Sequence, residues 1–271
     1  MNTHSHFNDN NICDFRKEII KMIHSFLIIG QSNMGGRGFV NEVEPIVNDK
    51  IMVLRNGRWR PMYVPVNPDR VTSGICLAES FADLYANEKN VEVGIIPCAD
   101  GGSCIDHWQE GGLLFDHACY QAELASRTST IAGVLWHQGE GDCSDERYPV
   151  YEEKLEKVMS AFRKRLGLYD VPFLLGGLGD YLSDCERSPM FKNYVYINEA
   201  IKNFTGRTDM TGFVSAEGLG ANPDNLHFSA KSLREFGVRY YNEFLKLEDK
   251  NKVFSEKLSV DDAIRTNLEL L

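Results

Sequence analysis

Four short segments of the sequence carry the residue types that acyl-transfer chemistry uses. Three combine glycines with hydroxyl, carboxylate or amide side chains and the fourth ends in a histidine; they are 30–36 (GQSNMGG), 98–103 (CADGGS), 136–142 (WHQGEGD) and 224–227 (DNLH). Ester hydrolysis needs a nucleophilic hydroxyl, an imidazole that takes its proton and N–H groups that hold an oxyanion. Together the four segments contain all of these parts.

Each segment can supply one part of such a site. Ser32 lies between an apolar run and glycines, where its hydroxyl can face a cleft. Gly101 and Gly102 let a backbone N–H approach a reacting oxygen closely, because no Cβ stands in the way. The side-chain amide of Gln138 can donate to the same oxygen. His227 can take the serine proton, with a carboxylate orienting its ring.

Apolar runs of strand length alternate with amphipathic runs of helix length along the chain. The predicted strands are 25–30, 51–54, 91–97, 131–137, 171–176 and 212–216, and the predicted helices are 75–88, 115–127, 148–166, 192–204 and 230–247. Several of the strands are continuously apolar, which is typical of parallel strands buried on both faces. This alternation predicts an α/β protein, a three-layer α/β/α sandwich around a parallel sheet.

Ligands of such folds bind beyond the carboxyl ends of the strands, where the first three segments fall. We expect one hydrolase domain over residues 25–249. An N-terminal extension, 1–24, precedes it, and a C-terminal extension, 250–271, which we expect to form a short helix, follows it.

Composition excludes several classes of function. The 271 residues hold 29 Lys and Arg against 39 Asp and Glu, a formal charge of -10, so neither nucleic acid nor a membrane surface is an expected partner. No apolar run approaches the ~20 residues that span a bilayer. The seven cysteines form no CxxC pair, and the first residues do not resemble a secretory signal. We therefore expect a cytoplasmic protein with no metal and no cofactor; its oligomeric state stays open.

The four segments also resemble those of a known family. FLIIGQSNMGG, PCADGGSCIDHW, GVLWHQGEGD and DNLHFS occur in the same order as in the SGNH (GDSL-like) hydrolases, within the branch of sialate O-acetylesterases and acetylxylan esterases, carbohydrate esterase family six. The resemblance extends from residue 25 to residue 229 and implies the flavodoxin-like SGNH fold. It implies Ser32 as the nucleophile, His227 as the base, and an oxyanion hole made of Ser32, Gly101 or Gly102, and Gln138, where the wider superfamily has asparagine.

Two questions about the site stay open at this point. Asp224 lies three residues before His227, the usual spacing for the acid of the triad, but Glu140 is a competitor, because the resemblance to this branch also implies that glutamate as the partner of the histidine. The residues beside the nucleophile, Gln31 and Asn33, are candidates for binding the substrate. The indole of Trp108 can stack on a sugar at the rim of the cleft or pack in the core.

The sequence leaves competing functions. The leading hypothesis is a serine esterase that removes acetyl groups from a small carbohydrate through an acetyl-enzyme, with acetylxylan, xylo-oligosaccharides and acetylated sialic acid all open as substrates. A mononucleotide-binding protein is the first alternative, although the sequence has neither GxxxxGK[ST] nor GxGxxG in the glycine segment. A sugar-binding protein without turnover is the second.

Overall fold

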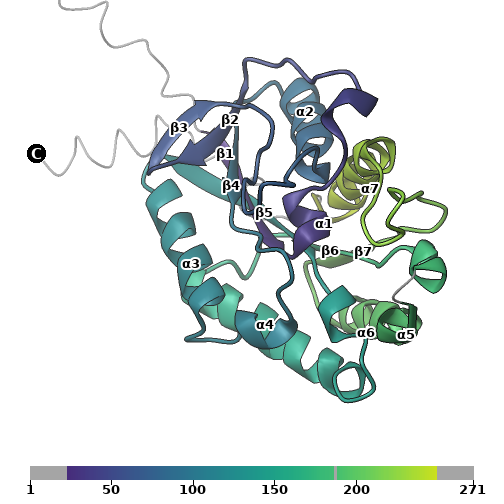
Figure 1. Ribbon diagram of the computed structural model, residues 1–271. Helices are drawn as coiled ribbons and strands as arrows, with labels where there is room; N and C mark the ends of the chain where they lie inside the picture. The colour runs from purple at the N-terminus through teal and green to yellow at the C-terminus, as the bar shows by residue number, and fades with distance from the viewer. Residues whose placement is uncertain (1–22, 186–187, 249–271) are drawn as a thin grey trace, which may run out of the picture.

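The computed structural model describes residues 23–185 and 188–248 (Figure 1). Most of the predicted N-terminal extension and the whole of the predicted C-terminal extension lie outside the described residues. No helix in residues 23–185 and 188–248 is long and apolar enough to cross a membrane.

The described strands form one seven-stranded sheet in the order β3-β2-β4-β1-β5-β6-β7. Neighbouring strands are parallel, except that the edge strand β3 pairs antiparallel with β2. The strands are β1 (Ile23–Gly30), β2 (Ile51–Arg55), β3 (Arg58–Pro61), β4 (Val93–Pro97), β5 (Ser129–His137), β6 (Phe173–Gly176) and β7 (Thr211–Val214). The predicted α/β class with a largely parallel central sheet is confirmed.

Helices cover both faces of this sheet (Figure 1). One face packs against α2 (Leu77–Lys89) and α7 (Ala230–Glu248), and the other against α3 (Leu113–Ala125), α4 (Tyr151–Leu166) and α6 (Tyr194–Arg207). The residues of β1 alternate between the two cores: Phe26 and Ile28 face the first, whereas Leu27 and Ile29 face the second. Burial on both faces explains why residues 26–29 of the strand are all apolar.

Short elements complete the described chain. These are the one-turn helices α1 (Ser32–Gly35) and α5 (Ser188–Phe191) and the 3-10 turns η3 (Val40–Glu42), η4 (Ile105–Trp108), η5 (Glu140–Asp142), η6 (Tyr148–Val150) and η7 (Asp180–Asp184). None of them was predicted as a separate element. β1 begins two residues before the predicted strand, and β3 was missed because only Trp59 of its four residues is not exposed, so it carries no apolar pattern.

Candidate active site

The turn between β1 and α1 places Ser32 at the carboxyl edge of the sheet. Gly30 has φ +135°, and a Cβ there would lie 2.1 Å from the carbonyl oxygen of His137, so only glycine fits between the ends of β1 and β5. The N–H of Gln31 donates to that same carbonyl at 2.9 Å. Ser32 then opens α1, where the backbone N–H groups of the first turn have no helical acceptor.

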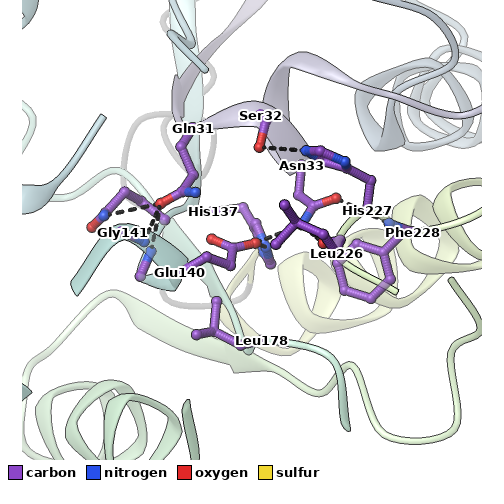
Figure 2. Close-up of polar contacts among 12 residues, drawn as sticks. Gln31, Ser32, Asn33, His137, Glu140, Gly141, Leu178, Leu226, His227 and Phe228 are labelled. Atoms are coloured by element: carbon purple, nitrogen blue, oxygen red, sulfur yellow. Dashed lines mark hydrogen bonds and ion pairs between the residues drawn. The ribbon is translucent and has the colours of Figure 1, made fainter. Parts of the chain in front are cut away.

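Ser32 and His227 meet although 195 residues separate them in the chain (Figure 2). Ser32 Oγ lies 3.0 Å from His227 Nε2, and His227 Nδ1 lies 2.7 Å from Asp224 Oδ2. The backbone N–H groups of Leu226 and His227 both donate to Asp224 Oδ1 at 3.0 Å, which fixes the carboxylate against the ring. A hydroxyl, an imidazole and a carboxylate thus form one continuous chain of hydrogen bonds.

Hydrogen bonds keep Asp224 ionised. Partial burial opposes its charge, but the bond from the His227 ring and the two backbone N–H groups together hold the pKa of Asp224 below its usual value. Its side chain is 48% exposed. This carboxylate therefore remains negative at neutral pH, where it can stabilise a protonated His227.

Glu140, the competing acid, contacts a different histidine. Its Oε1 accepts from Asn33 Nδ2 at 2.5 Å and lies 3.2 Å from His137 Nε2, and its side chain is 2% exposed (Figure 2). Burial opposes its ionisation, but the electrostatic contribution of the His137 ring and the hydrogen bonds from His137 and Asn33 hold the pKa of Glu140 below its usual value. The geometry thus assigns Asp224, and not Glu140, to His227.

Asn33 lies behind the pocket and not in it, which corrects its prediction as a substrate-binding residue. It is 1% exposed and all of its amide groups are bonded within the protein. Nδ2 donates to Glu140 and to the carbonyl of Leu226 at 3.2 Å, and Oδ1 accepts the N–H of Phe228 at 3.0 Å. The residue next to the nucleophile therefore holds both peptide groups that flank the histidine.

Gln138 does not face the pocket either, which corrects its prediction as an oxyanion donor. The residue is completely buried, and its Nε2 lies within hydrogen-bond distance of Asp142 Oδ2 (2.6 Å), Gln31 Oε1 (3.1 Å) and the carbonyl of Ser103 (3.3 Å). The shortest of these contacts is to the carboxylate of Asp142, four residues further along the chain, and the sequence pattern did not indicate it. The amide is turned into the protein, where it joins three loops.

Trp108 belongs to the core, which settles the question left open for it. Its side chain is completely buried, its Nε1 donates to Ser103 Oγ at 3.1 Å, and its ring packs edge-on against Trp136. It is not available to stack on a sugar.

The glycine segment after β4 offers one free N–H. The N–H of Gly101 donates to Asp69 Oδ2 at 2.8 Å, so it is occupied. Gly102 has φ +79°, a Cβ there would meet nothing within 4 Å, and its N–H has no acceptor among the described residues. Of the two predicted glycines, Gly102 is the one whose N–H can reach a ligand.

The residues that hold this glycine segment were not predicted from the sequence. The side chain of Asn67 bonds both the carbonyl and the N–H of Ala99, at 2.9 and 3.0 Å. Asp69 forms a two-pronged ion pair with Arg37, at 3.0 and 2.7 Å, and each side chain is 6% exposed. The only signal in the sequence was the NPDR turn at 67–70, which indicates a loop and no particular contact.

A pocket of about 680 Å³ opens at this edge of the sheet, a volume typical of small-molecule sites. Its wall includes Ser32, Gln31, Gly102 and His227. It also includes three arginines, Arg37, Arg70 and Arg147. No group of three or more His, Cys, Asp or Glu side chains in the described part of the chain could hold a metal ion.

Comparisons with known proteins find a matching family and a similar protein. A family model described as "Carbohydrate esterase, sialic acid-specific acetylesterase" matches residues 22–246. A probable carbohydrate esterase of Arabidopsis thaliana is 26% identical over 249 residues, which cover 81% of this chain and 89% of that protein.

Solved structures share the fold. A 1.6 Å crystal structure of an Arabidopsis thaliana protein aligns with a TM-score of 0.73 and 24% identity over 83% of this chain and 98% of that one. NanS aligns with a TM-score of 0.67 and 17% identity over 85% and 98%. A carbohydrate acetylesterase of Xanthomonas citri aligns with a TM-score of 0.59 and 20% identity over 80% and 55%.

Proposed function

Because the chain belongs to the carbohydrate esterase family of sialic acid-specific acetylesterases, and is therefore a carboxylic ester hydrolase of the SGNH type, we propose that it is a serine esterase that removes O-acetyl groups from a sugar. The observation that carries this proposal is the chain of hydrogen bonds from Ser32 through His227 to Asp224 at the wall of the pocket.

In the first half of the reaction, Ser32 Oγ attacks the acetyl carbonyl while His227 Nε2 takes the hydroxyl proton. Asp224 beside Nδ1 stabilises the imidazolium that forms. The carbonyl oxygen becomes negative, and the N–H groups of Ser32 and Gly102 donate to it. His227 then returns the proton to the sugar oxygen, which leaves as an alcohol, and an acetyl-Ser32 ester remains.

In the second half, a water molecule takes the place of the sugar. His227 removes a proton from this water as it attacks the acetyl carbonyl, and the same two N–H groups hold the second oxyanion. Collapse of this intermediate breaks the bond to Ser32 Oγ, to which His227 returns the proton. Acetate leaves and the free enzyme is restored.

The arginines on the pocket wall favour a sugar that carries a carboxylate. The chain as a whole has a formal charge of -10, yet the wall carries three guanidinium groups, and Glu140, 3% exposed, is the one carboxylate residue among those that line it. Arg37 is buried against Asp69. Arg70 and Arg147 also pair with aspartates, Asp100 at 3.0 Å and Asp142 at 3.7 Å, but their side chains are 50% and 43% exposed and keep N–H groups open to the pocket. Guanidinium groups bind carboxylates well, so we propose an acetylated sialic acid-type sugar over a neutral xylo-oligosaccharide.

Acetate release from defined sugars tests both parts of this proposal. We expect a higher kcat/KM for O-acetylated sialic acid than for acetylated xylo-oligosaccharide, and loss of both activities in Ser32→Ala. Arg147→Gln should raise KM about tenfold for the acidic sugar, in line with the loss of one charge-assisted contact, and leave 4-nitrophenyl acetate unaffected. Arg165→Gln is the matched control, because Arg165 is similarly exposed and paired with Glu123 away from the pocket. Equal kcat/KM values for acidic and neutral sugars would contradict the substrate assignment.

A further inference from the structure

Gln31, directly before the nucleophile, has a side-chain amide whose two ends lie in different surroundings. Its Oε1 lies 3.2 Å from the N–H of Gly139, 3.2 Å from the N–H of Gly141 and 3.1 Å from Gln138 Nε2. Three donors thus converge on one oxygen. In Figure 2 this oxygen faces Gly141 and the nitrogen of the same amide faces the other way.

The three donors fix the orientation of the amide. Rotating it by half a turn would place an NH2 group against two backbone N–H groups and another amide nitrogen, with no acceptor among them. The nitrogen must therefore occupy the opposite side. Gln31 is 4% exposed and lines the pocket beside Ser32. All hydrogen bonds that its side chain makes to described residues end on Oε1, so its Nε2 has no acceptor among them.

The second glutamine shows the reverse arrangement. The nitrogen of Gln138 is surrounded by Asp142, Gln31 and the carbonyl of Ser103, so it cannot turn to the pocket without leaving the carboxylate of Asp142 unpaired. Its bond to Gln31 Oε1 instead helps to orient the Gln31 amide. Gln138 thus orients the amide of Gln31, and the nitrogen of Gln31 is free to donate.

We propose that Gln31 Nε2 is the third donor to the oxyanion, beside the N–H groups of Ser32 and Gly102. The proposal rests on the function proposed above. The amide is neutral, almost buried and held in place by the loop of residues 139–141 before substrate arrives, so it needs little reorganisation when the carbonyl oxygen becomes negative. No proton leaves it; it strengthens its hydrogen bond as the tetrahedral intermediate forms.

Gln31→Glu tests the role of the amide nitrogen separately from that of the amide oxygen. Glutamate keeps an oxygen for Gly139, Gly141 and Gln138 but replaces the free NH2 group with an oxygen that repels the oxyanion. We expect kcat with 4-nitrophenyl acetate to fall on the order of 10²–10³-fold, with KM and the melting temperature close to those of the unmodified protein. The amplitude of the 4-nitrophenol burst counts folded active sites, and its rate reports the acetylation step directly.

Gln138→Met is the matched comparison. It removes the buried donor to Asp142, so it should lower the melting temperature more than Gln31→Glu does and kcat less. A near-normal burst rate in Gln31→Glu would overturn the proposal, and so would a large kcat loss at unchanged melting temperature in Gln138→Met. Ser32→Ala separates failure of the proposed function from failure of the proposed role of Gln31. If Ser32→Ala retains activity, the serine esterase mechanism is wrong. If Ser32→Ala is inactive and Gln31→Glu is normal, only the role of Gln31 is wrong.

Discussion

Two histidine–carboxylate pairs in the described part of the chain have the same spacing in sequence but different surroundings. Asp224 and His227 lie at the pocket, with side chains 48% and 19% exposed. His137 and Glu140 lie beneath it, with side chains 0% and 2% exposed. In each pair a carboxylate three residues away bonds one nitrogen of the ring.

The partner of the second ring nitrogen separates the two pairs. His227 Nε2 lies 3.0 Å from Ser32 Oγ, whereas His137 Nδ1 is buried without a hydrogen-bond partner among the described residues. Glu140 bonds Asn33, which in turn holds the peptide groups on either side of His227. We interpret the buried pair as a support that sets the position of the exposed pair. The three-residue spacing predicts that a carboxylate contacts the histidine, but only burial shows which of the two pairs can meet a substrate.

Replacing each histidine gives the largest expected contrast. His227→Gln removes the proposed base, and we expect kcat for acetate release to fall on the order of 10⁴–10⁶-fold. His137→Gln keeps a side-chain donor for Glu140, so its loss of kcat should be far smaller while its melting temperature falls. Equal losses of kcat in two folded variants would mean that the pairs do not have separate roles.

Replacing each carboxylate sharpens the same contrast. Asp224→Asn leaves the ring without its counter-charge, and we expect kcat to fall on the order of 10²–10⁴-fold with little change in urea denaturation. Glu140→Gln removes a buried charge-assisted hydrogen bond and should lower the free energy of unfolding by about 1.5–3 kcal/mol. A stable but inactive Glu140→Gln beside an active Asp224→Asn would transfer the role of triad acid to Glu140.

Acid titration of stability gives the smallest expected effect. The pKa of Glu140 is lowered in the folded protein, so ionised Glu140 stabilises the fold above its ordinary pKa of 4.5, and this contribution is lost as the pH falls through the lowered value. The gap in unfolding free energy between the unmodified protein and Glu140→Gln should therefore be full at pH 7 and narrow below about pH 4.5. The pKa of the half-exposed Asp224 is also lowered, so its contribution to stability is likewise lost as the pH falls. The difference in unfolding free energy between the unmodified protein and Asp224→Asn should be smaller than that for Glu140→Gln. A gap for Glu140→Gln that stays constant from neutral to acid pH would contradict this reading.

Much of this arrangement could be predicted from the sequence because it depends on short-range signals. Continuous apolar runs mark strands buried on both faces, and the segments that follow β1, β4 and β5 are then bound to meet at one edge of the sheet. The spacing of Asp224 and His227 lets the carboxylate reach the ring within one turn of chain.

What the sequence could not show was the direction in which each amide points. Gln138 and Gln31 have the same side chain, and only the position of Asp142 and of the N–H groups of Gly139 and Gly141 decides which nitrogen is free. Asn33 was predicted to bind the substrate because it lies next to the nucleophile, and Trp108 was a candidate for stacking on a sugar, but packing buries both. Occupation of the Gly101 N–H by Asp69 depends on a loop more than thirty residues away that has no motif.

Trapping the acetyl-enzyme tests the central claim most directly. The protein would be mixed with 4-nitrophenyl acetate, quenched in acid within the first turnover, digested and analysed by mass spectrometry. We expect one added acetyl group on the peptide that contains Ser32, and no acetyl group on the corresponding peptide of Ser32→Ala. An acetyl group on another residue, or unchanged acetate release by a folded Ser32→Ala, would contradict it.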